Sequence, residues 1–190
     1  MEQLALMSEN RTDEDLLAEC RNGSREAFEW LFVTNQKRVF SVALNFFGGD
    51  EALAKDITQQ AFLKIFYKVG EFRGQSELTT WIYRMTVHAC IDEQRRRRRF
   101  FSIENFFGDF TVKRAQDDKI HSKEISDEVQ KAIATLKPKF RLPILLKYVE
   151  NLSYQEIAEV LDCSIGTISS RLNRGHKMLA QRLGHLKNEI

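Results

Sequence analysis

Apolar residues recur at every third or fourth position along most of this chain, which is the spacing of one face of an α-helix. The clearest run follows Asp50, where apolar residues fall four apart at Leu53, Ile57, Ala61, Ile65 and Val69. No stretch alternates apolar and polar residues as a half-buried strand does, and the 190 residues include only two prolines and nine glycines. We therefore predict an all-α protein.

Signals for helix starts divide the first hundred residues into four expected helices. A short polar residue stands before each amphipathic run, where its side chain can accept a hydrogen bond from a free backbone amide. These capping residues are Thr12, Ser24, Asp50 and Ser76. The Gly48-Gly49 pair separates the second helix from the third. Residues 1–99 are expected to form one helical domain.

Helical spacing is lost after residue 99, and residues 100–123 read FFSIENFFGDF followed by mainly polar residues. We expect a flexible linker there, whose phenylalanines favour docking against another surface. A second helical domain is expected over residues 124–190, with helices near 125–136 and 140–150. Pro143 is compatible with the latter helix only if that helix begins a few residues earlier or bends. The expected architecture is two small helical domains joined by a flexible linker.

The stretch from Ser153 to Lys177 predicts a helix-turn-helix. Ser153 and Glu156 have the spacing of a capping box, and Ser164 can cap a second helix after a short turn. The apolar stripe of the second helix leaves a polar and basic face outward. That face contains Thr167, Ser169, Ser170, Asn173, Arg174 and Lys177. In such a motif these side chain types read base edges and hold phosphates in the DNA major groove.

The distribution of charge also favours a nucleic acid as partner. The whole chain is nearly neutral, with 29 basic and 27 acidic residues. Residues 163–188, however, contain no Asp or Glu and five cations, namely Arg171, Arg174, Lys177, Arg182 and Lys187. A phosphate backbone would be attracted to this end of the chain. An ordinary helical hairpin with a solvated basic face is the alternative.

A second cationic face is expected on the fourth helix. Its members fall three or four positions apart and are Arg84, His88, Asp92, Arg95 and Arg99. Five consecutive arginines, residues 95–99, exceed what a solvated helix end needs and favour phosphate binding. Phe72, Trp81 and Tyr83 lie beside this face, and aromatic rings next to arginine can stack on single-stranded bases. Trp81 is equally well explained as a core residue.

Catalytic and metal chemistry have little support in the sequence. Cys20, Cys90 and Cys163 form no CxxC or Cys/His cluster, so we expect buried thiols, no metal site and no cofactor. The histidines lie far apart, and no carboxylate cluster or Gly-rich phosphate loop indicates an enzyme. No signal-peptide pattern and no run of roughly 18 apolar residues appears. A cytoplasmic protein without membrane insertion is expected.

Three segments, in this order, resemble the sigma-70 family of bacterial transcription initiation factors, specifically its compact extracytoplasmic function group. The family's core-binding helix is similar to AKDITQQAFLKIFYKV, its promoter-melting and −10 segment to FRGQSELTTWIYRMTVHACIDEQRRRRR, and its −35 reader to LSYQEIAEVLDCSIGTISSRLNRGHKML. The resemblance implies an alternative sigma factor, without catalytic activity, that directs promoter-specific initiation. A stand-alone helix-turn-helix regulator is the second hypothesis.

The resemblance also implies partners and contact residues. The first domain would bind the clamp helices of the core RNA polymerase β′ subunit, the last would bind the β flap, and an anti-sigma factor would cover both. The core polymerase set is Asp56, Gln59, Gln60 and Phe62. The −10 set is Phe72, Trp81, Arg84, His88, Asp92, Arg95, Arg96 and Arg99, with residues 72–80 holding a flipped base. The −35 set is Thr167, Ser169, Ser170, Arg171, Asn173, Arg174 and Lys177. The family often has Glu at position 60 and a cation at position 169.

Overall fold

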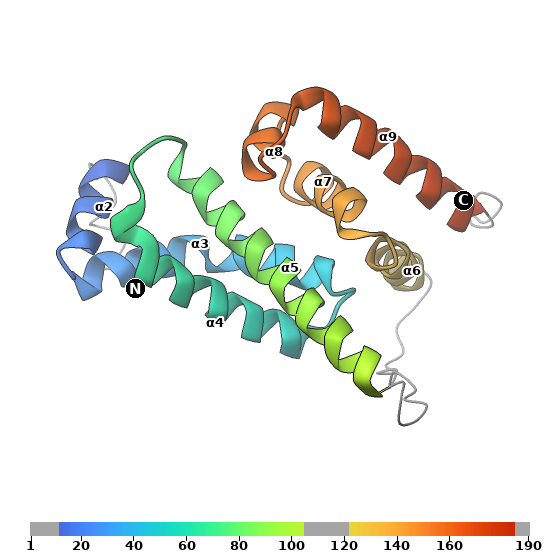
Figure 1. Cartoon of the computed structure of the whole chain (residues 1–190), viewed down its shortest axis with the longest axis horizontal. Helices are drawn as coiled ribbons and strands as arrows, with labels where there is room; N and C mark the ends of the chain where they lie inside the picture. Colours follow the sequence, from blue (N-terminus) through green and yellow to red (C-terminus); the bar gives the residue numbers. More distant parts are fainter. Residues whose placement is uncertain (1–11, 105–121, 185–190) are drawn as a thin grey trace.

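The computed structural model of the chain describes residues 12–104 and 122–184, with the side chains of 12–99 and 128–184. The first stretch contains α2 (Asp13–Arg21), α3 (Arg25–Phe46), α4 (Glu51–Lys68), the 3₁₀ turn η1 (Val69–Glu71) and α5 (Leu78–Glu104). The second contains α6 (Ser122–Ala134), α7 (Pro138–Tyr148), α8 (Tyr154–Val160) and α9 (Ile165–Arg182). No strand occurs in either stretch, so the predicted all-α class is confirmed (Figure 1).

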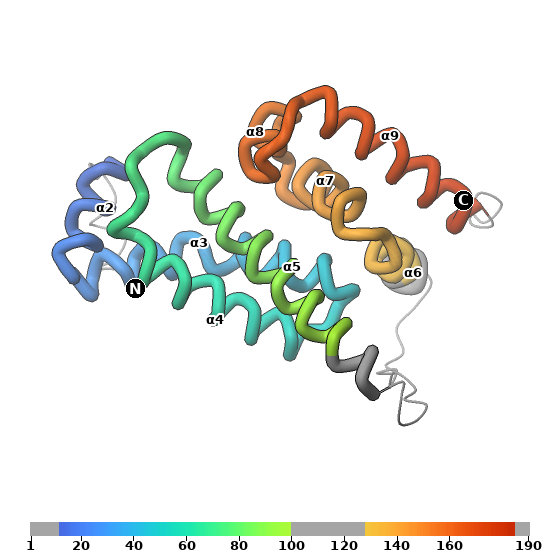
Figure 2. Tube along the Cα trace, viewed as in Figure 1, coloured from blue at the N-terminus to red at the C-terminus, as the bar shows by residue number. Residues whose placement is uncertain are grey.

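The first half is built on three long helices, α3, α4 and α5, which pack on one another (Figure 2). Their apolar stripes meet at fully buried side chains such as Leu31, Ile57 and Ile82. Burying each of these side chains stabilises the fold by about 1.5–3 kcal/mol. The capping predictions for α3 and α4 are confirmed, because Ser24 accepts from the Ala27 amide at 3.2 Å and Asp50 from the Leu53 amide at 2.9 Å.

The start of α5 differs from the prediction. Ser76 does not cap the helix, because its hydroxyl donates instead to the carbonyl of Glu77 at 3.4 Å. That same carbonyl accepts the first helical bond, from the Trp81 amide at 3.1 Å. At its other end α5 continues through Glu104, five residues into the expected linker, and arginine is a favourable helix residue. The linker phenylalanines and the docking expected of them lie outside the described residues.

Pro143 lies inside α7, which begins with Pro138 in its first turn. A proline at the first helical position is compatible with a helix, because the amide it lacks would be unpaired there anyway. Pro143 is the sixth residue, so the acceptor it would have used is a carbonyl of that first turn. The early start of α7 therefore explains how the helix contains this second proline.

The two halves of the chain pack against each other, with α6 and α7 on α3 and α8 on α5 (Figure 1). Their buried apolar residues form one continuous cluster. Arg141 is central to this contact: it is 5% exposed, its Nη1 donates to the Phe46 carbonyl at 2.7 Å, and its guanidinium lies 4.6 Å above the Phe46 ring. Burial lowers the pKa of Arg141 to about 10. The sequence pattern had indicated two separate modules and no such contact.

Candidate nucleic-acid and polymerase interfaces

Helices α8 and α9 form the predicted helix-turn-helix. The capping box is confirmed, because the Ser153 amide donates to the Glu156 carboxylate at 2.7 Å and the Glu156 amide donates to the Ser153 hydroxyl at 3.2 Å. These bonds lower the pKa of Glu156. The turn contains Asp162 with φ of 48°, a left-handed conformation that aspartate tolerates. Ser164 then caps α9, accepting from the Thr167 amide at 3.2 Å.

One face of α9 packs on α7, and the opposite face is open. Ile168, Leu172 and Gly175 are buried, and a Cβ at position 175 would lie 2.7 Å from Cδ1 of Ile144. The helices therefore approach closely at this glycine. The exposed members of the −35 set are Ser169, Ser170, Asn173, Arg174 and Lys177. The structure thus brings five of the seven predicted residues onto one open surface.

The other two members of the −35 set lie at the side of that surface. Thr167 and Arg171 are half-buried, and Nη1 of Arg171 lies 3.6 Å from the sulfur of Cys163. Cys163 is itself half-buried, unlike Cys20 and Cys90, so the expectation of three buried thiols is wrong for this one. The reason is its place in the turn, where the side chain is not enclosed by either helix.

The aromatic members of the −10 set are largely inside the first half. Phe72 is 6% and Trp81 8% exposed, with ring centroids 5.2 Å apart. The guanidinium of Arg21 holds the Phe72 carbonyl by a hydrogen bond. These residues form one wall of a small cavity of about 280 Å³, and the polar side chains of Arg73, Gln75 and Ser76 line the rest with Glu71 and Arg84. The cavity has a size and an aromatic wall suited to a single planar group.

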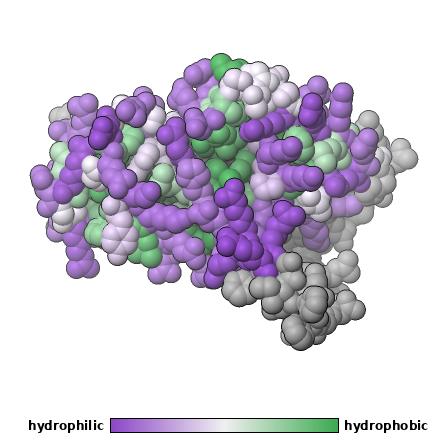
Figure 3. All heavy atoms as spheres, viewed as in Figure 1, coloured by the Kyte–Doolittle hydropathy of each residue, from purple (hydrophilic) through white to green (hydrophobic). Residues whose placement is uncertain are grey.

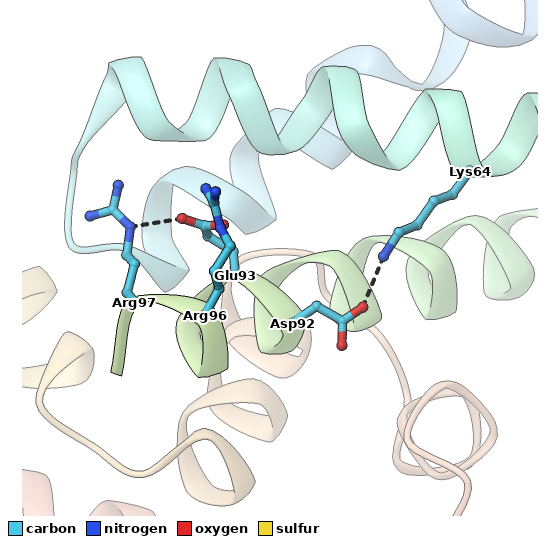
Figure 4. Close-up of polar contacts among 5 residues, drawn as sticks. All are labelled: Lys64, Asp92, Glu93, Arg96 and Arg97. Carbon is cyan, nitrogen blue, oxygen red and sulfur yellow. Dashed lines mark hydrogen bonds and ion pairs between the residues drawn. The ribbon is translucent and has the colours of Figure 1, made fainter. Parts of the chain in front are cut away.

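Arg84 connects the predicted −10 face to the helix-turn-helix. Its Nη2 donates to the carbonyl of Glu159 in α8 at 2.7 Å, and its buried Nε has no hydrogen-bond partner among the described residues. His88 and Asp92, one and two turns further along α5, are exposed. Asp92 pairs with Lys64 of α4 at 2.9 Å (Figure 4). Arg84 is half-buried and bonded to α8, so the exposed part of the predicted face begins at His88.

The arginine run is divided by Glu93. The side chain of Glu93 is only 3% exposed, and it accepts from Nε of Arg96 at 2.7 Å and from Nε of Arg97 at 3.0 Å (Figure 4). Burial acts to raise the pKa of Glu93, but the bonds and charges of these two arginines outweigh it, so the pKa is lowered. Arg95, Arg98 and Arg99 are exposed and make no ion pair with any described residue.

A long apolar groove runs between α3 and α4. Its volume is about 950 Å³, and its apolar lining consists of Phe28, Phe32, Phe40, Phe62, Leu63 and Phe66. Gln59 and Phe62 of the core polymerase set line this groove, whereas Asp56 and Gln60 are exposed on α4 beside it. The sequence analysis did not predict that α3 forms one side of this groove. The feature that could have indicated it is that α3 contains more phenylalanines than one buried stripe needs.

Among the described residues, no group of three or more His, Cys, Asp or Glu side chains is arranged to hold a metal ion. Within the same ranges, every helix is too short or too polar to cross a membrane.

Comparison with known proteins gives two family matches. Residues 31–100 match Sigma-70 region 2, and residues 126–179 match Sigma-70, region 4. The ECF RNA polymerase sigma-E factor of Escherichia coli (strain K12) is 30% identical over 187 residues, which cover 93% of this chain and 97% of that protein. The RNA polymerase sigma-H factor of Pseudomonas aeruginosa is 29% identical, over 93% of this chain and 96% of that protein.

Two solved structures share the fold. The sigma factor RpoE, in complex with the anti-sigma factor NepR from Bartonella quintana, has a TM-score of 0.65 at 22% identity and covers 83% of this chain and 96% of its own. CnrH, in complex with the cytosolic domain of CnrY, has a TM-score of 0.67 at 20% identity and covers 91% of this chain and 97% of its own.

Proposed function

This chain belongs to the extracytoplasmic function group of the sigma-70 family, and from that membership we propose that it binds core RNA polymerase and directs transcription from specific promoters. It is an alternative sigma factor, and it acts by binding rather than by catalysis. The observation that carries the proposal is the presence of two separate exposed surfaces with polar and cationic side chains on one chain. One is the open face of α9, and the other is the cationic end of α5.

The second domain, residues 124–190, reads the −35 element. Ser169, Asn173 and Arg174 are exposed near the middle of α9, where a recognition helix meets base edges. Arg174 is the strongest candidate for specificity, because arginine can contact guanine with two hydrogen bonds. Lys177, Arg171, Thr167 and Ser170 flank this group and contact the phosphate backbone, which contributes affinity without selectivity.

The first domain, residues 1–99, recognises and melts the −10 element. The cavity at Phe72 and Trp81 accepts one unstacked base, because its aromatic wall offsets part of the few kcal/mol that unstacking costs. Arg84 orients this base when α8 moves away. The remaining members of the −10 set are exposed further along α5, where the separated DNA strand passes. They are His88, Asp92, Arg95, Arg96 and Arg99.

The groove between α3 and α4 is the docking surface for core polymerase. It exposes large apolar side chains, including Leu63 at 50% and Phe66 at 51%, that a free surface would not keep without a partner. Gln59 and Phe62 contribute from within the groove, and Asp56 and Gln60 contribute polar contacts at its edge. The partner is the pair of β′ clamp helices, while the second domain contacts the β flap.

Promoter binding requires the two halves to separate. The −35 and −10 elements are named for their positions, which differ by about 25 base pairs. At 3.4 Å per base pair this is roughly 85 Å. In the structure α8 packs directly on α5. The packed arrangement is therefore a resting state, and an anti-sigma factor of the kind bound to RpoE would act on it. The protein works in the cytoplasm, where polymerase and chromosome meet.

Run-off transcription tests this proposal. The purified chain, core polymerase and genomic promoter fragments are combined, and specific transcripts are expected only when chain and core enzyme are both present. Binding of the chain alone to promoter DNA is expected to be weak. Tight and specific operator binding without polymerase, with no transcripts in its presence, would support the stand-alone regulator instead.

A further inference from the structure

A cleft between the two halves is lined by five cationic side chains. Its volume is about 510 Å³. Arg95 and Arg98 reach it from α5, Lys137 and Lys139 from the start of α7, and Arg171 from α9. No carboxylate is among the described residues that line it. The cations thus come from both domains and from three helices.

These five cations have no anionic partner among the described residues. Their neighbours Arg96 and Arg97 differ, because both are paired with Glu93 (Figure 4). Hydrophilic residues gather over this part of α5 on the face shown in Figure 3. Bringing like charges together raises the free energy of the packed arrangement, and an anion in the cleft would lower it.

Two further features of the cleft indicate the chemistry of that anion. The start of α7 has no side-chain cap, since Lys137 occupies the cap position, so its partial positive charge adds to that of the side chains. The rest of the lining is mainly apolar: it includes Ile91, Leu142 and Leu161, with Pro138 and the polar Gln94. A ligand that satisfies both features has several negative charges and a flat or apolar portion.

We propose that this cleft binds a nucleoside polyphosphate. The phosphate chain contacts the arginines and lysines of both domains, and the base packs on the apolar wall. The volume is within the range of small-molecule sites, about 300–1,000 Å³. Because the site is complete only when the halves are packed, a bound nucleotide stabilises that arrangement by mass action. This consequence for promoter binding rests on the proposed function, whereas the site itself does not.

Isothermal titration of the full chain with ATP, with tripolyphosphate and with a six-nucleotide single-stranded DNA tests the site. We expect ATP to bind at low salt, more tightly than tripolyphosphate, because only ATP uses the apolar wall. Arg98→Gln in the first domain and Lys139→Gln in the second should each weaken ATP binding about fivefold or more. Both residues are exposed, so the fold should be retained, which circular dichroism checks.

Arg182→Gln is the matched control, because it removes one exposed charge from α9 outside the cleft lining. It should change ATP affinity less than twofold. An equal loss in the control, an effect confined to one domain, absence of ATP binding, or a larger loss of oligonucleotide binding than of ATP binding in the two cleft variants would each overturn the proposal. These titrations contain no polymerase and no promoter, so their failure would leave the sigma-factor role intact, and failure of run-off transcription would leave the nucleotide site intact.

Discussion

The hydroxyl of Tyr83 in α5 donates a 2.7 Å hydrogen bond to the carboxylate of Glu150, which follows α7. The other oxygen of that carboxylate accepts from the hydroxyl of Ser41 in α3 at 2.8 Å. One acidic residue of the second half thereby joins two helices of the first. Burial, and then the bond to Glu150, raise the pKa of Tyr83 above its usual value. The tyrosine therefore remains a donor throughout the neutral range.

Replacing Tyr83 with phenylalanine should loosen the packing of the two halves. The ring keeps its contacts, but a largely buried hydrogen bond is lost, which lowers the free energy of unfolding by about 1 kcal/mol. Urea denaturation measures this change. Tyr67→Phe is the control, because Tyr67 is 77% exposed, and it should leave stability unaltered. Equal stability of the two variants would contradict a stabilising role for the Tyr83 bond.

Replacing Glu93 with glutamine should destabilise the chain at neutral pH and much less in acid. The folded pKa of Glu93 lies below the unfolded value, so its contribution is present above about pH 4.5 and is lost as pH falls through the folded pKa. We expect a loss of about 1 kcal/mol at pH 7, because the arginine partners are partly solvated. Thermal unfolding of both proteins between pH 3 and 7 measures the difference.

The control for that experiment is Glu51→Gln. Glu51 belongs to a 3.9 Å pair with Lys55 in which both side chains are more than 70% exposed, at 73% and 71%. Its removal should change stability little at any pH, since exposed pairs contribute weakly. A difference between wild type and Glu93→Gln that stays constant with pH would refute the assignment of the stabilisation to the charged carboxylate.

Replacing Leu63 with aspartate should weaken binding to core polymerase by at least about tenfold. Leu63 lines the α3–α4 groove and is 50% exposed, so a charge there opposes an apolar partner while the interior is undisturbed. Fluorescence titration of labelled chain with core enzyme measures the affinity. Val33→Asp is the control: Val33 is 41% exposed on α3 but does not line the groove. Similar losses in both variants would argue against the groove as docking surface.

Replacing Arg174 with alanine should reduce initiation from promoters that depend on the −35 element and relax selectivity at one base pair. A base-reading arginine contributes about 1–3 kcal/mol to discrimination. Lys177→Ala should instead weaken initiation on all −35 sequences to a similar degree, because a phosphate contact is not selective. Run-off transcription across single-base variants of the −35 element distinguishes the two. An unchanged promoter profile for Arg174→Ala would reject its proposed role.

Local features of this protein followed from sequence alone because their causes lie within a few residues. The capping box of Ser153 and Glu156, the cap at Ser164 and the outward face of α9 depend on spacings of three or four positions, and the structure reproduces them. Ser76 is the exception among the caps. Its hydroxyl was chemically suitable, but α5 begins at Leu78, one residue later than a cap at Ser76 requires.

The long-range partners and the burial of individual side chains could not be predicted from their positions in the sequence. The five arginines of residues 95–99 look alike in the sequence, yet Glu93 pairs with two of them while Arg95 and Arg98 face the second half. The helical spacing alone left open whether Trp81 was core or platform, and the packing of Phe72 against it buries both. The groove that Phe62 lines could not be predicted either, because it forms only where α3 and α4 pack together.

The sequence by itself determined the helices, their order, the helix-turn-helix and the family, because these depend on local periodicity and on motifs read along the chain. Only the tertiary structure decided how the halves meet. Arg141 contacts the end of α3, and Arg84 contacts α8. Glu150 joins α3 to α5, because it binds Ser41, 109 positions away in the sequence, and Tyr83, 67 positions away. Such contacts depend on how the folded helices pack in three dimensions, which the spacing of residues along the sequence does not predict.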